Sequence, residues 1–464
     1  MKLRYASPLF LAAAVVLLTT AVASPRAKHD AATESRFLGD AEENAKQLID
    51  QGRKIFRFDT YGDEAFWTDK LGIQQAVGSL TPRDALALGL KVDAEALSPR
   101  IVEAINGGKV NLDDPAVTLQ LLEQNAVLGV VGSFEGGSLR KVGFTCALCH
   151  STVDDSVAPG IGKRIDGLAN RDLNVGAIIA AAPDLQPVVE LLRLAPQNSG
   201  IGADDVRKVL ESWGPGKFDA ELFLDGKAFN PKQVTNGVVT ATNVSGAVLI
   251  PNAQGLSGHN LHTWTGGWGT VTYWNAFVAV NELHGIGTFF DERFDDANQF
   301  PIAAAAKLGH VSVDPDEDQV TSKLAALHFY QLALPAVQPR PGTDFDPAAA
   351  ARGGELFSGK ANCNSCHHKP LWTEPGWNQH SADELKIDGF EADRAPGRAY
   401  RTMNLAGLFV RERGLFMSPQ NKGRFYHDGR FKELLELVDS YNERFHLGLS
   451  DDEKKDLIEY LKSL

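Results

Sequence analysis

Sulfur-containing residues are scarce in this sequence, which has four cysteines and three methionines among 464 residues. Long apolar runs are scarce too: beyond residue 18, no stretch approaches the roughly eighteen apolar residues that a membrane-spanning helix needs. Basic residues are outnumbered, since 46 lysines and arginines face 59 acidic residues and leave a net charge of −13. These shortages argue against membrane insertion of the mature chain and against binding to nucleic acid or anionic lipid.

The remaining composition is that of a folded globular protein. Hydrophobic residues make up 43% of the chain and charged residues 23%, which argues against global disorder. A chain of this length is typical of one to three domains.

The N-terminus has the pattern of a secretory signal peptide. Lys2 and Arg4 precede an apolar stretch over residues 9–18, and Ala21-Val22-Ala23 offers small residues at the two positions that a signal peptidase reads. This pattern predicts a signal peptide over residues 1–23 with cleavage before Ser24. An uncleaved anchor is the alternative. We therefore expect a periplasmic or otherwise exported protein.

All four cysteines belong to two copies of one motif, Cys-x-x-Cys-His. The copies are Cys146-Ala-Leu-Cys149-His150 and Cys363-Asn-Ser-Cys366-His367. This is the attachment signature of c-type haem. Two thiols three residues apart on a helical turn can each form a thioether with a haem vinyl group, and the following histidine then reaches the iron. The sequence therefore predicts two covalently bound haem c groups, with His150 and His367 as iron ligands.

Paired cysteines also occur in redox-active dithiols and in zinc sites, but neither use explains these motifs. A redox-active dithiol does not require a histidine directly after the second cysteine, and here one follows in both copies. A structural zinc site wants four ligands, and the first motif has only His150 nearby. Export and haem attachment also support each other, because c-type haem is attached outside the cytoplasm.

Helix and turn signals predict how the chain is organised. Helices are expected over residues 41–58, 81–88, 98–105, 114–128 and 178–194, the last with a break near Pro183. Gly132, Gly136 and Gly137 are expected to break the chain before the first haem motif, and residues 234–250 to form a hairpin or an irregular strand pair. Asp346 before Pro347 caps another helix, and Ser450-Asp-Asp-Glu453 is a capping box for a last one.

These signals predict a mainly α fold with two cytochrome-c-like haem domains, the first enlarged by helical and irregular insertions with little β structure. Four prolines and no helical periodicity mark residues 335–347 as a linker. We therefore expect an N-terminal haem domain over residues 24–334, with an extra helical region, and a C-terminal cytochrome c domain over residues 348–464.

Several segments resemble the di-haem cytochrome c peroxidase and MauG-like superfamily. Residues 346–464 carry the resemblance through Arg352-Gly-Gly-Glu-Leu-Phe, the second haem motif, Tyr400-Arg-Thr, Phe425-Tyr-His427-Asp-Gly-Arg430-Phe and the helix after Ser450. Residues 51–59 resemble the helix that precedes the first haem in that family. A long stretch then separates Asp59 from Cys146, where the family has a short link, and residues 200–330 match no signature of it.

The far-side ligand of each iron decides between electron transfer and reaction with small oxidants. In the resembled family, a residue on the helix after the His-Asp-Gly motif ligates the second iron, and the matching position here is Tyr441. Met417 and Met403 are the alternatives, and each of the three could instead be an ordinary core residue. For the first iron, His262 and His284 lead because they flank an aromatic-rich block; the other candidates are His259, His310 and His328.

Other candidate residues follow from the same resemblance and from the chemistry of peroxide. Glu282, close to His284, is a candidate acid/base, although a solvated glutamate is the plainer interpretation. Trp264, Trp268 and Trp274 are candidate bridges between the haems, with a hydrophobic cluster as the alternative. His427 is expected to hydrogen-bond between the domains rather than to bind iron.

The expected function is that of a peroxidase-like di-haem oxidoreductase. Electrons would come from a soluble or membrane-bound redox donor protein and pass from the C-terminal haem to the N-terminal haem, where hydrogen peroxide is the expected oxidant. The alternative is a non-catalytic di-haem electron-transfer protein, and a third interpretation is a sensor module. The length favours the enzyme, because two simple carrier domains do not need so many residues.

Overall fold

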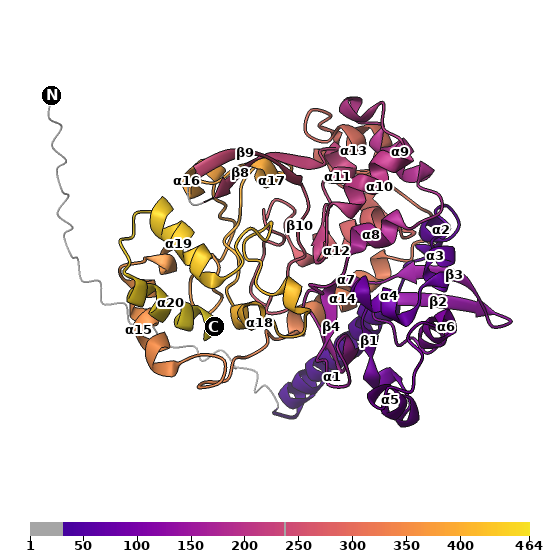
Figure 1. The fold of residues 1–464 in the computed structure, drawn as a ribbon, viewed down its shortest axis with the longest axis horizontal. Helices are drawn as coiled ribbons and strands as arrows, with labels where there is room; N and C mark the ends of the chain where they lie inside the picture. Colours follow the sequence, from indigo (N-terminus) through magenta and orange to yellow (C-terminus); the bar gives the residue numbers. More distant parts are fainter. Residues whose placement is uncertain (1–30, 236–237) are drawn as a thin grey trace, which may run out of the picture. The chain divides into compact units, whose positions relative to one another are not determined.

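The computed structural model describes residues 31–235 and 238–464. The chain divides into two compact units, residues 1–46 and 47–464. Of the first unit the structure describes the beginning of helix α1 (Ala31–Phe58), and the second unit holds all the other elements (Figure 1). The signal peptide predicted over residues 1–23 lies outside the described residues. No helix in the described part of the chain is long and apolar enough to cross a membrane.

Short helices with proline at their first position follow α1, as the sequence predicts. They are α4 (Pro82–Ala87), α5 (Pro99–Asn106) and α6 (Pro115–Glu123). Proline is favourable there because its fixed φ suits a helix and its missing N–H would have no partner. Helix α6 ends before the predicted residue 128, because Asn125 adopts a left-handed conformation and Val127 pairs with Val92 in a β-bridge.

The predicted helix over residues 178–194 is two helices, α8 (Val175–Ala180) and α9 (Gln186–Leu192), separated around Pro183. The other helices before the linker are α2 (Glu64–Trp67), α3 (Ile73–Ser79), α7 (Ala147–His150), α10 (Ala203–Glu211), α11 (Leu222–Asp225), α12 (Val271–Phe277), α13 (Pro301–Ala306) and α14 (Leu324–Ala333).

The strands form short pairs rather than a shared sheet. The five antiparallel pairs are β2 (Val130–Glu135) with β3 (Ser138–Phe144), β4 (Ser151–Val153) with β6 (Arg164–Asp166), β7 (Lys217–Phe218) with β10 (Val248–Leu249), β8 (Phe229–Thr235) with β9 (Val238–Ser245), and β11 (Phe289–Phe290) with β12 (His310–Val311). Strand β1 (Val92–Asp93) pairs with β5 (Ile161–Gly162) in parallel. The fold is thus mixed and mainly helical, while the division into two cytochrome-c-like domains stays a prediction.

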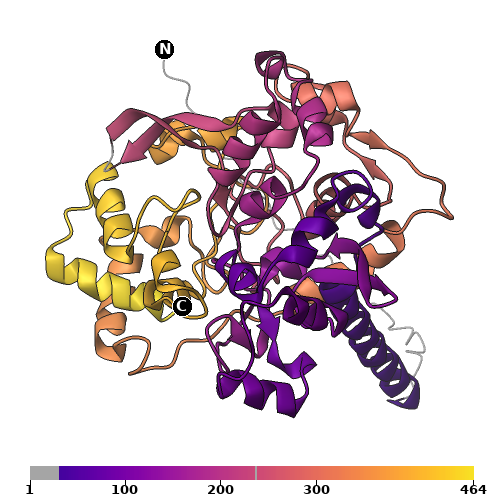
Figure 2. The ribbon, with the colours of Figure 1, turned by 45° about the vertical axis from the view of Figure 1, so that its right-hand side comes forward.

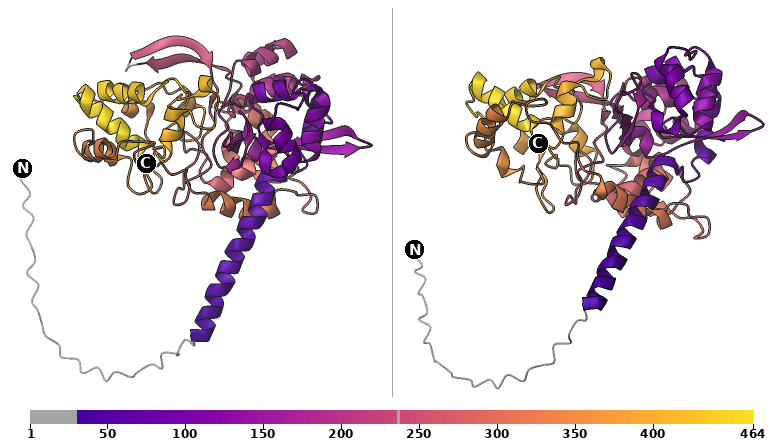
Figure 3. Two further views of the ribbon diagram at one scale, coloured as in Figure 1. Left: turned by 60° about the horizontal axis from the view of Figure 1, so that its bottom comes forward. Right: turned by 90° about the horizontal axis from the view of Figure 1, so that it is seen from below.

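Two hairpins differ from the sequence-based expectations. The glycine-rich break before the first haem motif is the turn of β2–β3, where Gly136 and Gly137 both have positive φ; this hairpin projects from the body of the unit (Figure 3). Two positive φ values favour the tight turn that matches strand twist. The second hairpin, β8–β9, begins before the predicted residue 234 and lies beside the C-terminal segment (Figure 2).

The chain after residue 346 folds around two packed helices, as predicted. Asp346 caps α15 (Pro347–Ser358), and the Ser450 capping box opens α20 (Asp451–Lys462). The two helices approach so closely that a Cβ on Gly353 would lie 2.0 Å from the Asp456 carbonyl oxygen. The remaining helices here are α16 (Ala382–Leu385), α17 (Phe390–Asp393), α18 (Leu408–Arg413) and α19 (Leu434–Arg444).

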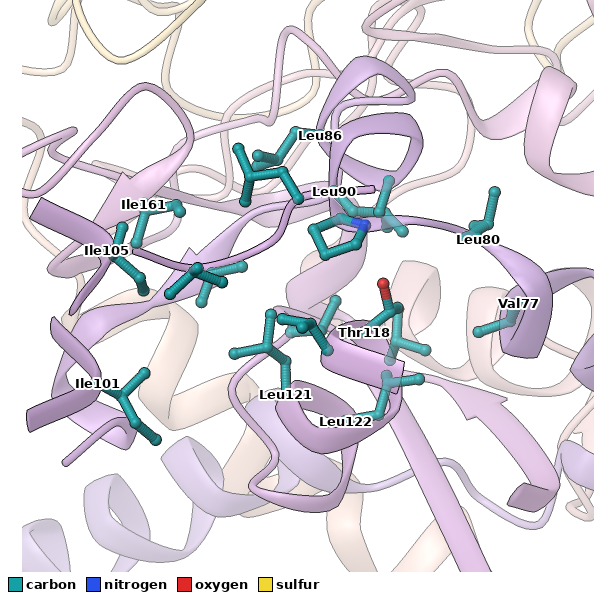
Figure 4. Close-up of a pocket in the computed structure, with 18 residues that line it drawn as sticks. Val77, Leu80, Leu86, Leu90, Ile101, Ile105, Thr118, Leu121, Leu122 and Ile161 are labelled. Carbon is teal, nitrogen blue, oxygen red and sulfur yellow. The ribbon is translucent and has the colours of Figure 1, made fainter. Parts of the chain in front are cut away.

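Separate hydrophobic clusters support the two haem motifs. The largest draws its side chains from residues 67–302, and another draws only on residues 357–461. Between α4, α5 and α6 lies a small cavity of about 50 Å³ walled by aliphatic side chains and Thr118 (Figure 4). The long stretch between Asp59 and Cys146 is therefore a packed region whose buried side chains belong largely to the same core as residues after the first haem motif.

Candidate functional site

The first motif lies at the end of the β2–β3 hairpin and opens onto a cavity. Cys146 precedes α7, so the two thiols share one helical turn, and the His150 amide donates to the Cys146 carbonyl at 3.1 Å. The Thr145 hydroxyl donates to the Arg57 carbonyl at 3.1 Å, which fixes the motif against α1. Both thiols and His150 line a cavity of about 220 Å³, called the first cavity below.

The buried thiols are poor nucleophiles. Burial raises the pKa of Cys146 to about 11 and that of Cys149 to about 12. A redox-active dithiol needs a lowered pKa, because the thiolate is the reacting form. Burial also lowers the pKa of His150 to about 4, so its ring is neutral at pH 7 and has a lone pair for a metal. This environment suits haem attachment and disfavours dithiol chemistry.

The structure brings both leading histidines for the first iron to this cavity. His262 is 4% exposed, and its Nε2 has no hydrogen-bond partner. The ring of His284 stacks on Phe66 with centroids 3.6 Å apart. Burial lowers the pKa of His262 to about 3 and that of His284 to about 4, so both rings are neutral. Either side chain can therefore offer a lone pair to a metal in the first cavity.

The other three histidine candidates lie outside the first cavity's lining. His310 is exposed and contacts both carboxylate oxygens of Asp295 at 2.9 Å. The Nδ1 of His328 lies 2.6 Å from the Thr272 hydroxyl. His259 lines a small separate cavity of about 10 Å³.

Three carboxyl groups line the first cavity: Glu282, Glu221 and Glu391. Burial raises the pKa of Glu282 well above its usual range, and the carboxylates of Glu221 and Asp219 raise it further. Burial likewise raises the pKa of Glu221 to about 7. The Oε2 atoms of Glu282 and Glu391 have no hydrogen-bond partner. Burial thus favours the protonated form of Glu282, which lines the first cavity beside the first motif.

The second motif opens onto a larger cavity of about 540 Å³, called the second cavity below. Cys363 begins a single turn of 3-10 helix, and the His367 amide donates to the Cys363 carbonyl at 3.0 Å. His367 Nδ1 lies 2.9 Å from the Trp372 carbonyl oxygen. A bond from Nδ1–H to that oxygen fixes the tautomer and leaves Nε2 free to bind a metal.

Two of the three candidates for the second iron's far side line the second cavity. They are Tyr441 and Met403, whereas Met417 is absent from its lining. Burial raises the pKa of Tyr441, and the Arg444 guanidinium, 4.5 Å from the centre of its ring, opposes that shift. Proximity thus favours Tyr441 and Met403 over Met417.

His427 also lines the second cavity. Its ring stacks on Tyr400 with centroids 5.3 Å apart, and its carbonyl accepts a hydrogen bond from Leu249 at 2.6 Å. Leu249 belongs to β10, in the part of the chain before the linker. His427 therefore joins the two halves of the sequence through its backbone, in addition to lining the cavity.

Trp264 lies between the two cavities and lines both. It is 9% exposed, its Nε1 donates to the Leu249 carbonyl at 2.7 Å, and its ring centroid is 6.5 Å from that of His427. Trp274 lines only the first cavity. Trp268 lines neither cavity. Its ring stacks on Phe277, and its Nε1 donates to the Glu221 carboxylate at 3.0 Å. Of the three predicted bridging tryptophans, only Trp264 is placed to connect the cavities.

A zinc site was the other structural alternative for the cysteines. Among the described residues, one group of side chains could hold a metal ion: Cys366, Glu374 and His380. Both nitrogens of His380 already face carboxylates, with Nε2 2.7 Å from Glu374 and Nδ1 2.8 Å from Glu384. Because a zinc site needs a free histidine nitrogen and usually four ligands, this group suits zinc poorly.

The chain's own residues fit a haem in each cavity. Each motif presents two thiols and a histidine to a predominantly apolar cavity, and several buried polar atoms that face the cavities have no partner in the protein. The unpartnered atoms facing the second cavity include donors of Arg171, Arg401 and Arg411. Such donors match the two carboxylate groups that a haem carries at one edge.

This geometry can be set beside known proteins. The chain is similar to a cytochrome-c peroxidase. It is 28% identical over 197 residues to cytochrome-c peroxidase IdrP1 of Denitromonas iodatirespirans, a match that covers 32% of this chain and 51% of that protein. The chain thus spans about half the length of the curated relative it matches.

No family model matches the chain. A solved structure of hydrazine synthase from Kuenenia stuttgartiensis shares 17% identity over 47% of this chain and 72% of that one. Its TM-score of 0.26 is too low to support any conclusion.

Some residues of the two cavities were not found from the sequence. Glu221, Glu391, Arg171 and Arg411 belong to none of the motifs named above, and Arg401 was singled out only as part of the Tyr400-Arg-Thr segment; these residues come from segments far apart in the chain. Neighbouring sequence gives no signal that they share a cavity, because Arg171 and Glu221 come from the part of the chain before the linker and Glu391, Arg401 and Arg411 from the part after it.

Proposed function

We propose that this chain is an exported di-haem c-type cytochrome and a peroxidase-like oxidoreductase, in which electrons pass from the C-terminal haem to the N-terminal haem. One observation carries the proposal: the two Cys-x-x-Cys-His motifs line two separate cavities that share Trp264 as a wall. The similarity to a cytochrome-c peroxidase supports the same conclusion. A haem in each cavity would supply one-electron chemistry at iron.

The chain's residues have distinct roles in this proposal. His150 and His367 bind the irons, and Tyr441 or Met403 would complete the coordination in the second cavity, with Met417 as the more distant alternative. Trp264 offers an aromatic ring between the two centres. Glu282 would deliver and accept the proton that cleavage of the peroxide O–O bond requires. Reduction of hydrogen peroxide to two waters takes two electrons from a redox donor protein and two protons.

Haem content is the first test of the proposal. We expect the protein purified from a host that attaches c-type haem to contain two haems per chain, measured by its alkaline pyridine spectrum and by its intact mass. Cys149→Ser together with Cys146→Ser should remove one haem, and the corresponding change at Cys363 and Cys366 should remove the other. A wild-type chain with no covalently bound haem would refute the proposal.

Peroxide turnover tests the catalytic part. Glu282→Gln should lower the rate of peroxide-dependent oxidation of a reduced donor protein by about 10²–10⁴-fold, the usual contribution of a general acid/base. Glu317→Gln is the matched control, because Glu317 is exposed and lies outside both cavities. Equal rates for the two variants would show that Glu282 has no such role.

A non-catalytic electron-transfer protein is the second candidate, and one observation favours it. The Nε2 of His262 is buried and has no partner, and the residue lines the first cavity, so it could close the sixth position of the first iron. The EPR spectrum of the ferric and half-reduced protein separates the two candidates. A high-spin signal from one haem supports the enzyme, whereas two low-spin haems in both states, with no reaction with peroxide, support the carrier.

A further inference from the structure

The two cavities differ in the sign of the charge that they contain. The first is lined by Glu221, Glu282 and Glu391 and by a single arginine, Arg401. The lining of the second includes three arginines and no aspartate or glutamate. The contrast is not a consequence of composition, because the whole chain has a net charge of −13.

The three arginines of the second cavity have no carboxylate partner among the described residues. Arg171 is 4% exposed and makes no side-chain hydrogen bond, and its Nη1 is buried. Arg401 is 7% exposed; its Nε donates to the Thr263 carbonyl at 2.6 Å, while its Nη1 has no partner. Arg411 donates to the Arg424 carbonyl at 2.6 Å, while its Nε has no partner.

Buried cations without a counter-ion are strongly destabilising, because they lose hydration and gain no ion pair in return. An arginine guanidinium keeps its charge in proteins at any ordinary pH. The side chains therefore need an anion that the protein does not provide. Arginine forks pair best with carboxylates, and a haem presents two of them on one edge.

Arg401 has a further property that the other two arginines lack. It lines the first cavity as well as the second, beside Trp264, whose carbonyl accepts a hydrogen bond from the Arg401 amide at 3.2 Å. Arg171 and Arg411 line only the second. Arg401 therefore borders both cavities, and a charge in a poorly solvated site interacts more strongly with its neighbours than one in water.

We propose that Arg171, Arg401 and Arg411 are the counter-ions of the haem carboxylates in the second cavity, and that Arg401 is a positive charge shared by both redox centres. The proposal rests on the proposed function, since it needs a haem at each motif. Each one-electron reduction of ferric to ferrous iron adds one negative charge to a centre. A nearby cation stabilises that added charge, so it raises the midpoint potential of every centre that it reaches.

The experiment is a redox titration of the purified holoprotein with dithionite and mediators, followed by the visible absorption of both haems. Arg401→Gln should lower both midpoint potentials. Arg411→Gln is the matched control, because it removes the same charge from a residue that lines one cavity, and it should lower only one potential. Arg401→Lys keeps the charge and should return both potentials most of the way to the wild-type values.

Haem content separates failure of this inference from failure of the proposed function. Wild-type protein without two haems would overturn the proposed function, and this inference with it. If all variants hold two haems, unchanged potentials in Arg401→Gln would overturn the inference alone. So would a fall in only one potential, because Arg401 would then not be shared. A loss of the haem at the second motif in Arg401→Gln but not in Arg401→Lys would support the counter-ion role.

Discussion

The ion pairs of Arg394 offer a quantitative test of how the C-terminal segment is held beside the first cavity. Arg394 follows α17, and its side chain and those of Asp219 and Asp225 are completely buried. Its Nη2 contacts Asp219 at 2.8 Å, and its Nε contacts Asp225 at 2.9 Å. Arg394→Met would leave both carboxyl groups buried without a cation. Breaking a buried pair in this way typically costs about 3–5 kcal/mol.

The pH dependence of that cost can be worked out. Burial already raises the pKa of Asp219 to about 6 from a usual 3.8, despite Arg394, and removal of the cation raises it further. A carboxyl group whose pKa is raised in the folded state destabilises the fold little below its unfolded pKa. The destabilisation grows as the pH rises from the unfolded pKa towards the folded-state pKa. To keep such a carboxyl group protonated in the folded state, against its usual pKa of 3.8, costs at most about 6 kcal/mol at pH 8 but only about 2 kcal/mol at pH 5. The loss should therefore shrink as the pH falls.

The assay is urea unfolding followed by tryptophan fluorescence at pH 8 and pH 5. Arg83→Met is the matched control, because the side chains of Arg83 and Asp113 are 61% and 65% exposed, and it should change stability little. Arg394→Met combined with Asp219→Asn and Asp225→Asn should recover much of the loss, since no charge then stays unpaired. A loss below about 1 kcal/mol at pH 8, or one that does not shrink at pH 5, would refute the reasoning.

Two further predictions concern the C-terminal segment. Gly353→Ala should lower the free energy of unfolding by about 1–3 kcal/mol or more, measured by thermal unfolding, because the added Cβ would clash with the Asp456 carbonyl. Gly354→Ala is the control and should cost far less, because its Cβ would meet only the ring edge of Tyr460 at 3.2 Å. Equal losses in the two variants would contradict the packing of α15 on α20. His380→Gln should lower the free energy of unfolding more at pH 6 than at pH 9. Burial lowers the pKa of His380, but the hydrogen bonds and charges of Glu374 and Glu384 outweigh burial and raise it. The stability that the charged imidazole contributes is therefore lost as the pH rises. A pH-independent loss would contradict this.

Local rules predicted much of the secondary structure. The proline-initiated helices, the break at Pro183 and both caps of the C-terminal helices were confirmed, because each depends on a few neighbouring residues. A break of the chain was predicted at Gly136 and Gly137, but the β2–β3 hairpin around it and the end of α6 were not. The bridge from Val127 back to Val92 accompanies the end of α6, and the pairing of β2 with β3 decides the hairpin; neither pairing can be read from the pattern of one segment alone.

The sequence by itself determined the chemistry that the chain can offer. Two Cys-x-x-Cys-His motifs hold every thiol, and their spacing alone predicts two attachment sites, because the attachment geometry is local to one helical turn. The tertiary structure decided what surrounds them. It placed Trp264 and Arg401 against both cavities, put acids around one motif and arginines around the other, and left Met417 away from the second cavity. Those placements depend on contacts between residues more than a hundred positions apart, which no local pattern records.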